Sequence, residues 1–167
     1  GLWQGRKRVL GLVPVALATI LMIATPTPDI LISSDGRHVG IAGEDRRLLM
    51  LRNSRSDYAR ENLQEMAGTS GEVIPLAEWR GAECSRDFCV ITLNRGERDW
   101  HILMARSRDL VSERALAAAC ERADIVVADR YLPRSCQPLW LRADRRFLGE
   151  SGGLAIVLKD EAITRVS

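Results

Sequence analysis

One apolar run near the start of the chain limits what the rest can fold into. Residues 9–24 read VLGLVPVALATILMIA, in which Thr19 is the only polar side chain, and the basic cluster 6–8 stands directly before them. A bilayer core about 30 Å thick requires roughly 20 helical residues, and Leu2 and Trp3 can extend the run. Because membrane proteins keep positive flanks in the cytoplasm, we expect a membrane helix followed by a domain on the outer side.

Two other interpretations of this run stay open. A removable signal peptide has the same basic start and apolar middle, but residues 24–29, ATPTPD, offer no A-x-A cleavage signal. A buried core helix is disfavoured by Pro14 and by the basic flank. Because the chain begins with Gly rather than Met, we expect the helix to be the last of several in a longer protein.

The rest of the chain is long enough for one domain with a hydrophobic core. We therefore divide the chain into residues 1–25, the basic flank with the membrane helix, and residues 26–167, the outer domain. Of 24 basic and 22 acidic residues, three basic ones precede the helix, so the outer domain is close to neutral. A polyanion would have to be bound by a local basic patch rather than by overall charge.

Turn signals and apolar patterns predict a mixed α/β domain. Turns at 35–36 and 43–45 predict three antiparallel strands near 29–33, 37–42 and 47–52. We further expect helices at 55–67, 113–122 and 141–150, strands at 73–76, 88–93, 100–105, 124–129, 154–158 and 162–166, and a turn at 94–97. This order of elements indicates an α/β fold with a mixed sheet and helices on the outside.

Four cysteines, Cys84, Cys89, Cys120 and Cys136, all follow the apolar run. An even number of cysteines in an oxidising compartment favours disulfides, and we prefer the local pairs, Cys84 with Cys89 and Cys120 with Cys136. A zinc site is the alternative, although the chain has no C-x-x-C pair and its two histidines are distant in sequence. We expect no metal site and no cofactor.

No motif in the chain indicates catalysis. The G-x-S-x-G, P-loop and dinucleotide-binding motifs are all missing. Asp35 and His38 belong to an Asp-Gly turn that needs such residues for its backbone. Asp124 and Asp129 stand at the two ends of one predicted strand, about 16 Å apart at ~3.3 Å per residue, which is too far for an acid and base pair. We therefore expect no catalytic residues and no enzyme activity.

Two pairs of arginines follow predicted strands. The pairs are Arg106 with Arg108, and Arg130 with Arg134. Because both follow the carboxyl ends of candidate sheet strands, they could meet in space and bind phosphates. The alternative is that they are solvated loop arginines paired with Asp109 or Asp129.

Several stretches resemble a known family. They are TPDILISSDGRHVGI after the apolar run, then ECSRDFCVITL, CERADIVVADRYLPRSC and SGGLAI, and together they extend over nearly the whole chain. On these stretches the chain resembles the C-terminal part of ComEC-type competence proteins in the form found in alphaproteobacteria. Proteins of this type are polytopic inner-membrane channels for DNA uptake.

The resemblance implies a reduced, metal-free relative of the metallo-β-lactamase fold. TLNRGERDWHILMAR, the next helix and ADIVVADRYLPRS follow that fold's order of strand, helix and Asp-led strand. Its metal ligands are missing: Ala105 and Arg106 replace its aspartate, Asp129, Arg130 and Tyr131 replace its histidines, and no H-x-H-x-D-H occurs. The resemblance thus implies a domain without nuclease or hydrolase activity.

The resemblance also implies a place in the cell and a set of partners. We expect a non-catalytic periplasmic domain, anchored in the bacterial inner membrane, that covers a DNA-uptake channel of natural competence or guides DNA into it. Its expected partners are single-stranded or double-stranded DNA, the membrane and the preceding membrane helices of the same protein. The candidate DNA contacts are Arg106, Arg108, Arg130 and Arg134. The alternatives are a metal-dependent nuclease with unconventional ligands and an envelope protein-interaction module.

Overall fold

Two mixed β-sheets form the body of this computed structural model, which describes residues 13–20, 26–43, 47–52, 61, 64–69 and 72–166. The first sheet holds β1 (Ile30–Ile32), β2 (Val39–Ala42), β3 (Leu48–Met50), β4 (Val73–Pro75), β10 (Gly153–Val157) and β11 (Ala162–Val166). The second holds β5 (Ala82–Cys84), β6 (Phe88–Arg95), β7 (Arg98–Ala105), β8 (Ile125–Val127) and β9 (Leu141–Ala143). The labelled helical segments after β4 are η2 (Leu76–Glu78), α3 (Glu113–Cys120) and α4 (Arg145–Ser151).

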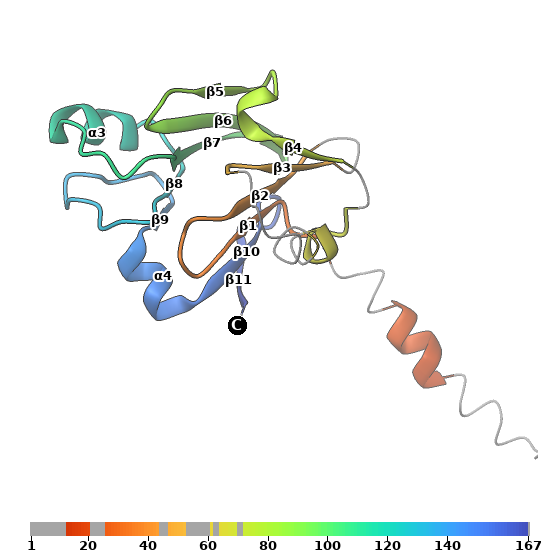
Figure 1. Ribbon diagram of the computed structural model, residues 1–167. Helices are drawn as coiled ribbons and strands as arrows, with labels where there is room; N and C mark the ends of the chain where they lie inside the picture. Colours follow the sequence, from red (N-terminus) through yellow and green to blue (C-terminus); the bar gives the residue numbers. More distant parts are fainter. Residues whose placement is uncertain are drawn as a thin grey trace, which may run out of the picture.

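The strand order explains how distant parts of the chain come together (Figure 1). The first sheet runs β11-β10-β1-β2-β3-β4, and only its β3–β4 pair is parallel. The second sheet runs β5-β6-β7-β8-β9, and its pairs β7–β8 and β8–β9 are parallel. The predicted mixed α/β fold is therefore confirmed, with two sheets where the sequence indicated one. The predicted strands near 29–33, 37–42 and 47–52 form the antiparallel part of the first sheet.

The hairpin of β6 and β7 is longer than the sequence predicted. Arg95 pairs with Arg98, so only Gly96 and Glu97 form the turn. Both have positive φ, 63° and 66°, as a two-residue type I′ turn requires. The predicted turn at 94–97 was therefore two residues too wide, because a Gly at the first turn position lets the strands continue to the tip.

The main hydrophobic core lies between the two sheets. In β6 buried and exposed side chains alternate, so that Cys89, Ile91 and Leu93 face the other sheet. The first sheet contributes further buried aliphatic residues, among them Ile30 and Ile41. Burial of apolar surface stabilises the folded state by roughly 25 cal/mol per Å², and this stabilisation holds the two sheets face to face.

Residues outside the strands cover the outer face of each sheet. On the second sheet, Leu116 of α3 packs against Leu103 and Val126. Ser112 caps α3 by accepting a hydrogen bond from the backbone N–H of Ala115 at 3.4 Å, which confirms the predicted helix start. On the first sheet, Ala67 belongs to the cluster of buried residues on the outer face.

The predicted helix at 141–150 was wrong in its first residues. Leu141–Ala143 form β9, a parallel neighbour of β8 with Leu141 and Ala143 buried. The helix begins only after Asp144, whose carboxylate accepts a hydrogen bond from the backbone N–H of Phe147 at 3.0 Å. The N-cap therefore sets the boundary, and apolar residues before it pair as a strand.

Two predicted helices fall partly or largely outside the described residues. Residues 13–20 are helical, and the rest of the apolar run 9–24 is not described. No helix in the described segments is both long and apolar enough to cross a membrane. Of the predicted helix at 55–67, residues 61 and 64–66 are helical, and the others that precede them are not described.

Candidate functional site

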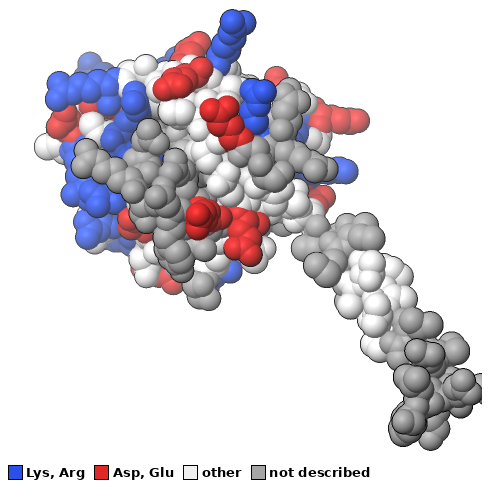
Figure 2. Space-filling view, turned by 45° about the vertical axis from the view of Figure 1, so that its right-hand side comes forward, with Lys and Arg blue, Asp and Glu red and all other residues white. Residues whose placement is uncertain are grey.

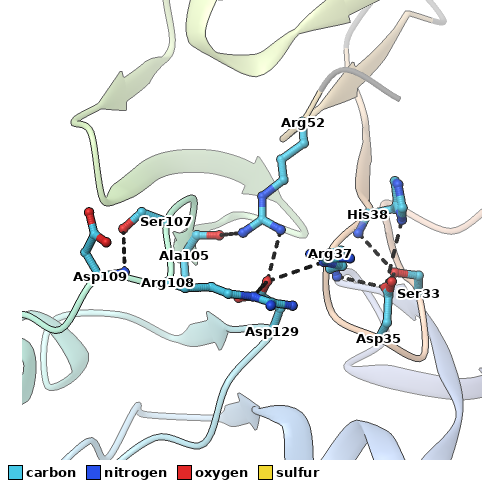
Figure 3. A network of polar contacts seen from close by, with 10 residues as sticks. All are labelled: Ser33, Asp35, Arg37, His38, Arg52, Ala105, Ser107, Arg108, Asp109 and Asp129. Carbon is cyan, nitrogen blue, oxygen red and sulfur yellow. Dashed lines mark hydrogen bonds and ion pairs between the residues drawn. The ribbon is translucent and has the colours of Figure 1, made fainter. Parts of the chain in front are cut away.

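A buried carboxylate lies at the centre of a cluster of arginines (Figure 3). Asp129 follows β8, and its side chain is only 1% exposed. Its Oδ2 atom accepts hydrogen bonds from Arg52 Nη1 at 3.1 Å and from Arg108 Nε at 3.3 Å. Arg37 Nε lies 3.7 Å from the same oxygen. We call these four residues, Arg37, Arg52, Arg108 and Asp129, the arginine cluster.

The sheet topology brings the cluster together. Because β7 and β8 are parallel neighbours, their carboxyl ends lie at one edge of the second sheet, where ligands of α/β proteins commonly bind. Arg108 follows β7 and Asp129 follows β8 at this edge. Arg52 comes from the end of β3 in the other sheet and also donates to the carbonyl oxygen of Ala105 at 3.2 Å.

A tight turn between β1 and β2 positions Arg37. Gly36 has φ +68°, and a Cβ atom there would lie 2.9 Å from the carbonyl oxygen of Ala128 and 2.9 Å from Leu148 Cδ1. The turn therefore packs directly on the end of β8 and on α4. Asp35 serves this turn as the sequence predicted, because its carboxylate accepts a hydrogen bond from the backbone N–H of Arg37 at 2.9 Å.

The charges of the cluster do not balance. Three guanidinium groups face one carboxylate, so the cluster has a net charge of +2. Burial raises the pKa of the Asp129 carboxyl, but the hydrogen bonds and charges of Arg52 and Arg108 outweigh burial and hold the pKa below its usual value. Asp129 is thus ionised at neutral pH, and excess positive charge remains.

The arginine cluster opens onto a cleft of about 460 Å³. The cleft is lined by Ser34, Asp35, Arg37, Arg108, Asp129, Tyr131, Arg145 and Gly149. Three arginines and two aspartates line it, and the Arg37 and Arg108 side chains are 49% and 60% exposed. Guanidinium groups bind phosphate through paired N–H donors, so this cleft is suited to an anion of that kind.

Two of the four predicted phosphate-binding arginines lie at this edge. Arg108 belongs to the arginine cluster, and Arg130 donates a hydrogen bond to the carbonyl oxygen of Asp109. The alternative reading, loop arginines paired with aspartates, is confirmed for Arg108 and Asp129. The carbonyl oxygen of Arg130 accepts a hydrogen bond from the backbone N–H of Arg145 at 3.2 Å, and its guanidinium lies 5.4 Å from the centre of the Phe88 ring.

The other two predicted arginines point elsewhere. Arg106 donates to the carbonyl oxygen of Ser85 at 2.8 Å and lines a different hollow, beside Pro75 and Glu78. Arg134 lies exposed in the irregular segment 132–138. The four arginines therefore do not converge on one point, and their role in binding DNA stays a prediction.

Sequence reasoning missed three arginines of the site. The sequence placed Arg37 at the start of the predicted strand 37–42 and Arg52 at the end of the predicted strand 47–52. Arg145 is the first residue of α4, which the sequence placed in the middle of a longer helix. The available signal was that Arg52, like Arg108, lies within three residues of the end of a strand. The packing of the two sheets decides that both meet Asp129.

Both predicted disulfides are present. Cys84–Cys89 joins the paired strands β5 and β6, and Cys120–Cys136 ties the end of α3 to the irregular segment 132–138. Among the described residues, no group of three or more His, Cys, Asp or Glu side chains could hold a metal ion. His101 Nδ1 lies 3.6 Å from Asp124 Oδ2, and the backbone N–H of His101 donates to the same carboxylate at 2.8 Å.

Positive charge is uneven over the surface. Residues 106–146 contain nine arginines and six acidic residues, a net charge of +3, although residues 26–167 as a whole are close to neutral. Figure 2 shows Lys and Arg side chains gathered along one side of the domain, while Asp and Glu side chains are scattered over the face toward the viewer. A local basic surface of this kind is what a near-neutral domain needs to attract a polyanion.

Comparisons with protein-family models, with curated proteins and with solved structures find no match to this chain.

Proposed function

We propose that residues 26–167 form a non-catalytic periplasmic domain of an inner-membrane DNA-uptake channel, and that this domain binds the phosphate backbone of DNA. The observation that carries the proposal is the arginine cluster, in which Arg37, Arg52 and Arg108 face the single carboxylate of Asp129. The excess positive charge opens onto a cleft at the carboxyl edge of parallel strands, a common place for phosphate ligands.

Two further features support this proposal. Disulfides form and persist in oxidising compartments such as the periplasm, and all four cysteines of the chain are paired. The succession of β7, α3 and the Asp-led β8 also has the order of strand, helix and strand on which the resemblance to the C-terminal part of ComEC-type proteins depends.

In this proposal the domain guides DNA by charge. Neutralising phosphates with arginines releases condensed counterions, which makes binding depend on salt but not on sequence. A domain at the mouth of a channel needs such binding, because it must accept any sequence and release it again. Arg37 and Arg108, the more exposed arginines of the cluster, are the side chains that we expect to exchange Asp129 for a phosphate.

Salt-dependent binding tests the proposal directly. Fluorescence anisotropy of a labelled DNA strand, titrated with the purified full chain at low and at moderate salt, measures the affinity and its salt slope. We expect binding that weakens steeply as salt rises. If the chain does not bind DNA at low salt, the proposal is wrong and the arginine cluster only holds the two sheets together.

A further inference from the structure

A second hollow lies beside the arginine-lined cleft. It has a volume of about 370 Å³ and is lined by Leu110, Val111, Glu113, Leu116, Arg130, Tyr131, Leu132 and Pro133. Five of these eight side chains are aliphatic or proline, so the hollow is mainly apolar. Tyr131 lines both this apolar hollow and the cleft of the arginine cluster, so the two hollows adjoin at this side chain.

Large apolar side chains are exposed at this place. Tyr131 is 66% exposed and Leu110 is 96% exposed. The guanidinium of Arg145 lies 6.0 Å from the centre of the Tyr131 ring, within reach of a cation–π contact. An exposed aromatic ring beside a cation and above an apolar hollow is a suitable platform for another flat, aromatic group.

We propose that the two hollows form one nucleotide site, in which the arginine-lined cleft takes a phosphate and the apolar hollow takes an unpaired base stacked on Tyr131. This inference rests on the proposed function and adds a base contact to it. Proteins that bind single strands without sequence preference combine a basic groove with aromatic side chains on which bases stack. Here Arg37 and Arg108 correspond to the basic groove, and Tyr131, which lines both hollows, corresponds to the aromatic side chain.

The composition of the apolar hollow agrees with a base rather than with a second phosphate. Glu113 is its only acidic side chain and Arg130 its only basic one. Arg130 is already engaged with the carbonyl oxygen of Asp109 and lies over the Phe88 ring. The hollow is therefore close to neutral, whereas the adjoining cleft has an excess of arginines.

An abasic strand separates the base contact from the phosphate contacts. The full chain is titrated with an oligodeoxyadenylate and with an abasic deoxyribose-phosphate strand of equal length. These titrations are repeated for Tyr131→Ala, Tyr131→Phe and the control Leu139→Ala, which removes an apolar residue that is 70% exposed and lines neither hollow. Because Tyr131 is exposed, none of these variants is expected to unfold the domain.

We expect the wild-type chain to bind the normal strand about fivefold more tightly than the abasic strand, which is the lower range of one stacking contact. Tyr131→Ala should remove this preference, whereas Tyr131→Phe and Leu139→Ala should keep it. Equal affinities of the wild-type chain for both strands, or a preference that survives Tyr131→Ala, would overturn the nucleotide site and leave the proposed function standing. If neither strand binds, the proposed function fails and the nucleotide site fails with it.

Discussion

Arg52 donates a hydrogen bond of 3.1 Å to Asp129, although the two residues are 77 positions apart and follow strands of different sheets. The same guanidinium also donates to the carbonyl oxygen of Ala105 at the end of β7. One side chain thus fastens the end of β3 to the ends of β7 and β8. The contact has a structural role of its own, and it places the positive charge at the edge where the cleft opens.

Removal of the Asp129 charge should destabilise the domain. In Asp129→Asn an amide replaces the carboxylate, so Arg52 and Arg108 lose their ionic partner. A hydrogen bond to a charged group contributes about 1.5–3 kcal/mol, and we expect the free energy of unfolding to fall by an amount in that range. Urea denaturation at neutral pH measures it. An unchanged free energy of unfolding would show that water replaces Asp129 as the partner of the arginines.

The contribution of Asp129 should depend on pH. Because its folded-state pKa lies below the usual value of 3.8, its stabilisation is fully present above the unfolded-state pKa and is lost as the pH falls through the folded-state pKa. The wild-type chain and Asp129→Asn should therefore differ most above about pH 5, and the difference should shrink as the pH falls below the usual value of 3.8 and disappear only below the folded-state pKa. Denaturation of both proteins over this range tests the sign, and a constant difference down to acid pH would contradict it.

Asp129→Asn should bind DNA more tightly while being less stable. The substitution raises the net charge of the cluster and releases Arg37 and Arg108 for phosphates. We expect a higher affinity at low salt and a salt slope that is steeper by about one. The control is Asp124→Asn, since Asp124 is also buried and paired, with Arg98 at 2.5 Å. The control should lose stability without a gain in affinity, and an equal gain in both variants would argue against a local effect.

Replacement of Gly36, in the turn that positions Arg37, should lower the free energy of unfolding. Gly36→Ala forces a Cβ atom against the backbone of Ala128 in a left-handed conformation, so we expect a loss of more than about 1 kcal/mol in the free energy of unfolding. Gly149→Ala is the matched control, because nothing lies within 4 Å of its new Cβ atom and alanine favours the helix. Thermal denaturation of both variants makes the comparison. Equal stability would mean that the turn does not pack on β8 as described.

The two disulfides should stabilise the domain unequally. By loop-closure entropy, Cys120–Cys136, with a sequence separation of 16, contributes about 3 kcal/mol, and Cys84–Cys89, with a separation of 5, contributes about 2 kcal/mol. Denaturation of the double alanine variants of each pair measures both. Thiol labelling of the wild-type chain without reductant should find no free cysteine in these pairs, and labelled thiols would reject the proposed oxidising compartment.

Turns, helix caps and single strands could be predicted from the sequence because each is determined by a few neighbouring residues. The Asp-Gly and Gly-Glu turns, the Ser112 cap and the buried run before Asp129 each depend on a few neighbouring residues. The division into two sheets depends on pairing between distant strands, such as β1 with β10, and no neighbouring residue specifies it. The β9 strand was missed because Leu141 and Ala143 suit a helix as well as a strand until the Asp144 cap is recognised.

The same distinction applies to the candidate site. Arg108 could be selected from the sequence because arginines after strand ends often meet at one edge of a sheet. Arg37 and Arg52 could not, since they reach Asp129 only when the first sheet packs on the second. Arg106 and Arg134 were selected by the same rule as Arg108, but Arg106 turns toward Ser85 and Arg134 lies further along the irregular segment.

The most direct test compares two double variants that lose the same charge. Arg37→Ala/Arg108→Ala removes the exposed arginines of the cluster, whereas Arg80→Ala/Arg165→Ala removes two exposed arginines that line neither the cleft nor the apolar hollow. The measurement is the salt dependence of DNA binding by the full chain. For the cluster variant only, we predict a weaker affinity for DNA and a dependence of log affinity on log salt that is shallower by about two. Equal losses in both variants, or no loss in the cluster variant, would contradict the claim that the arginine cluster binds DNA.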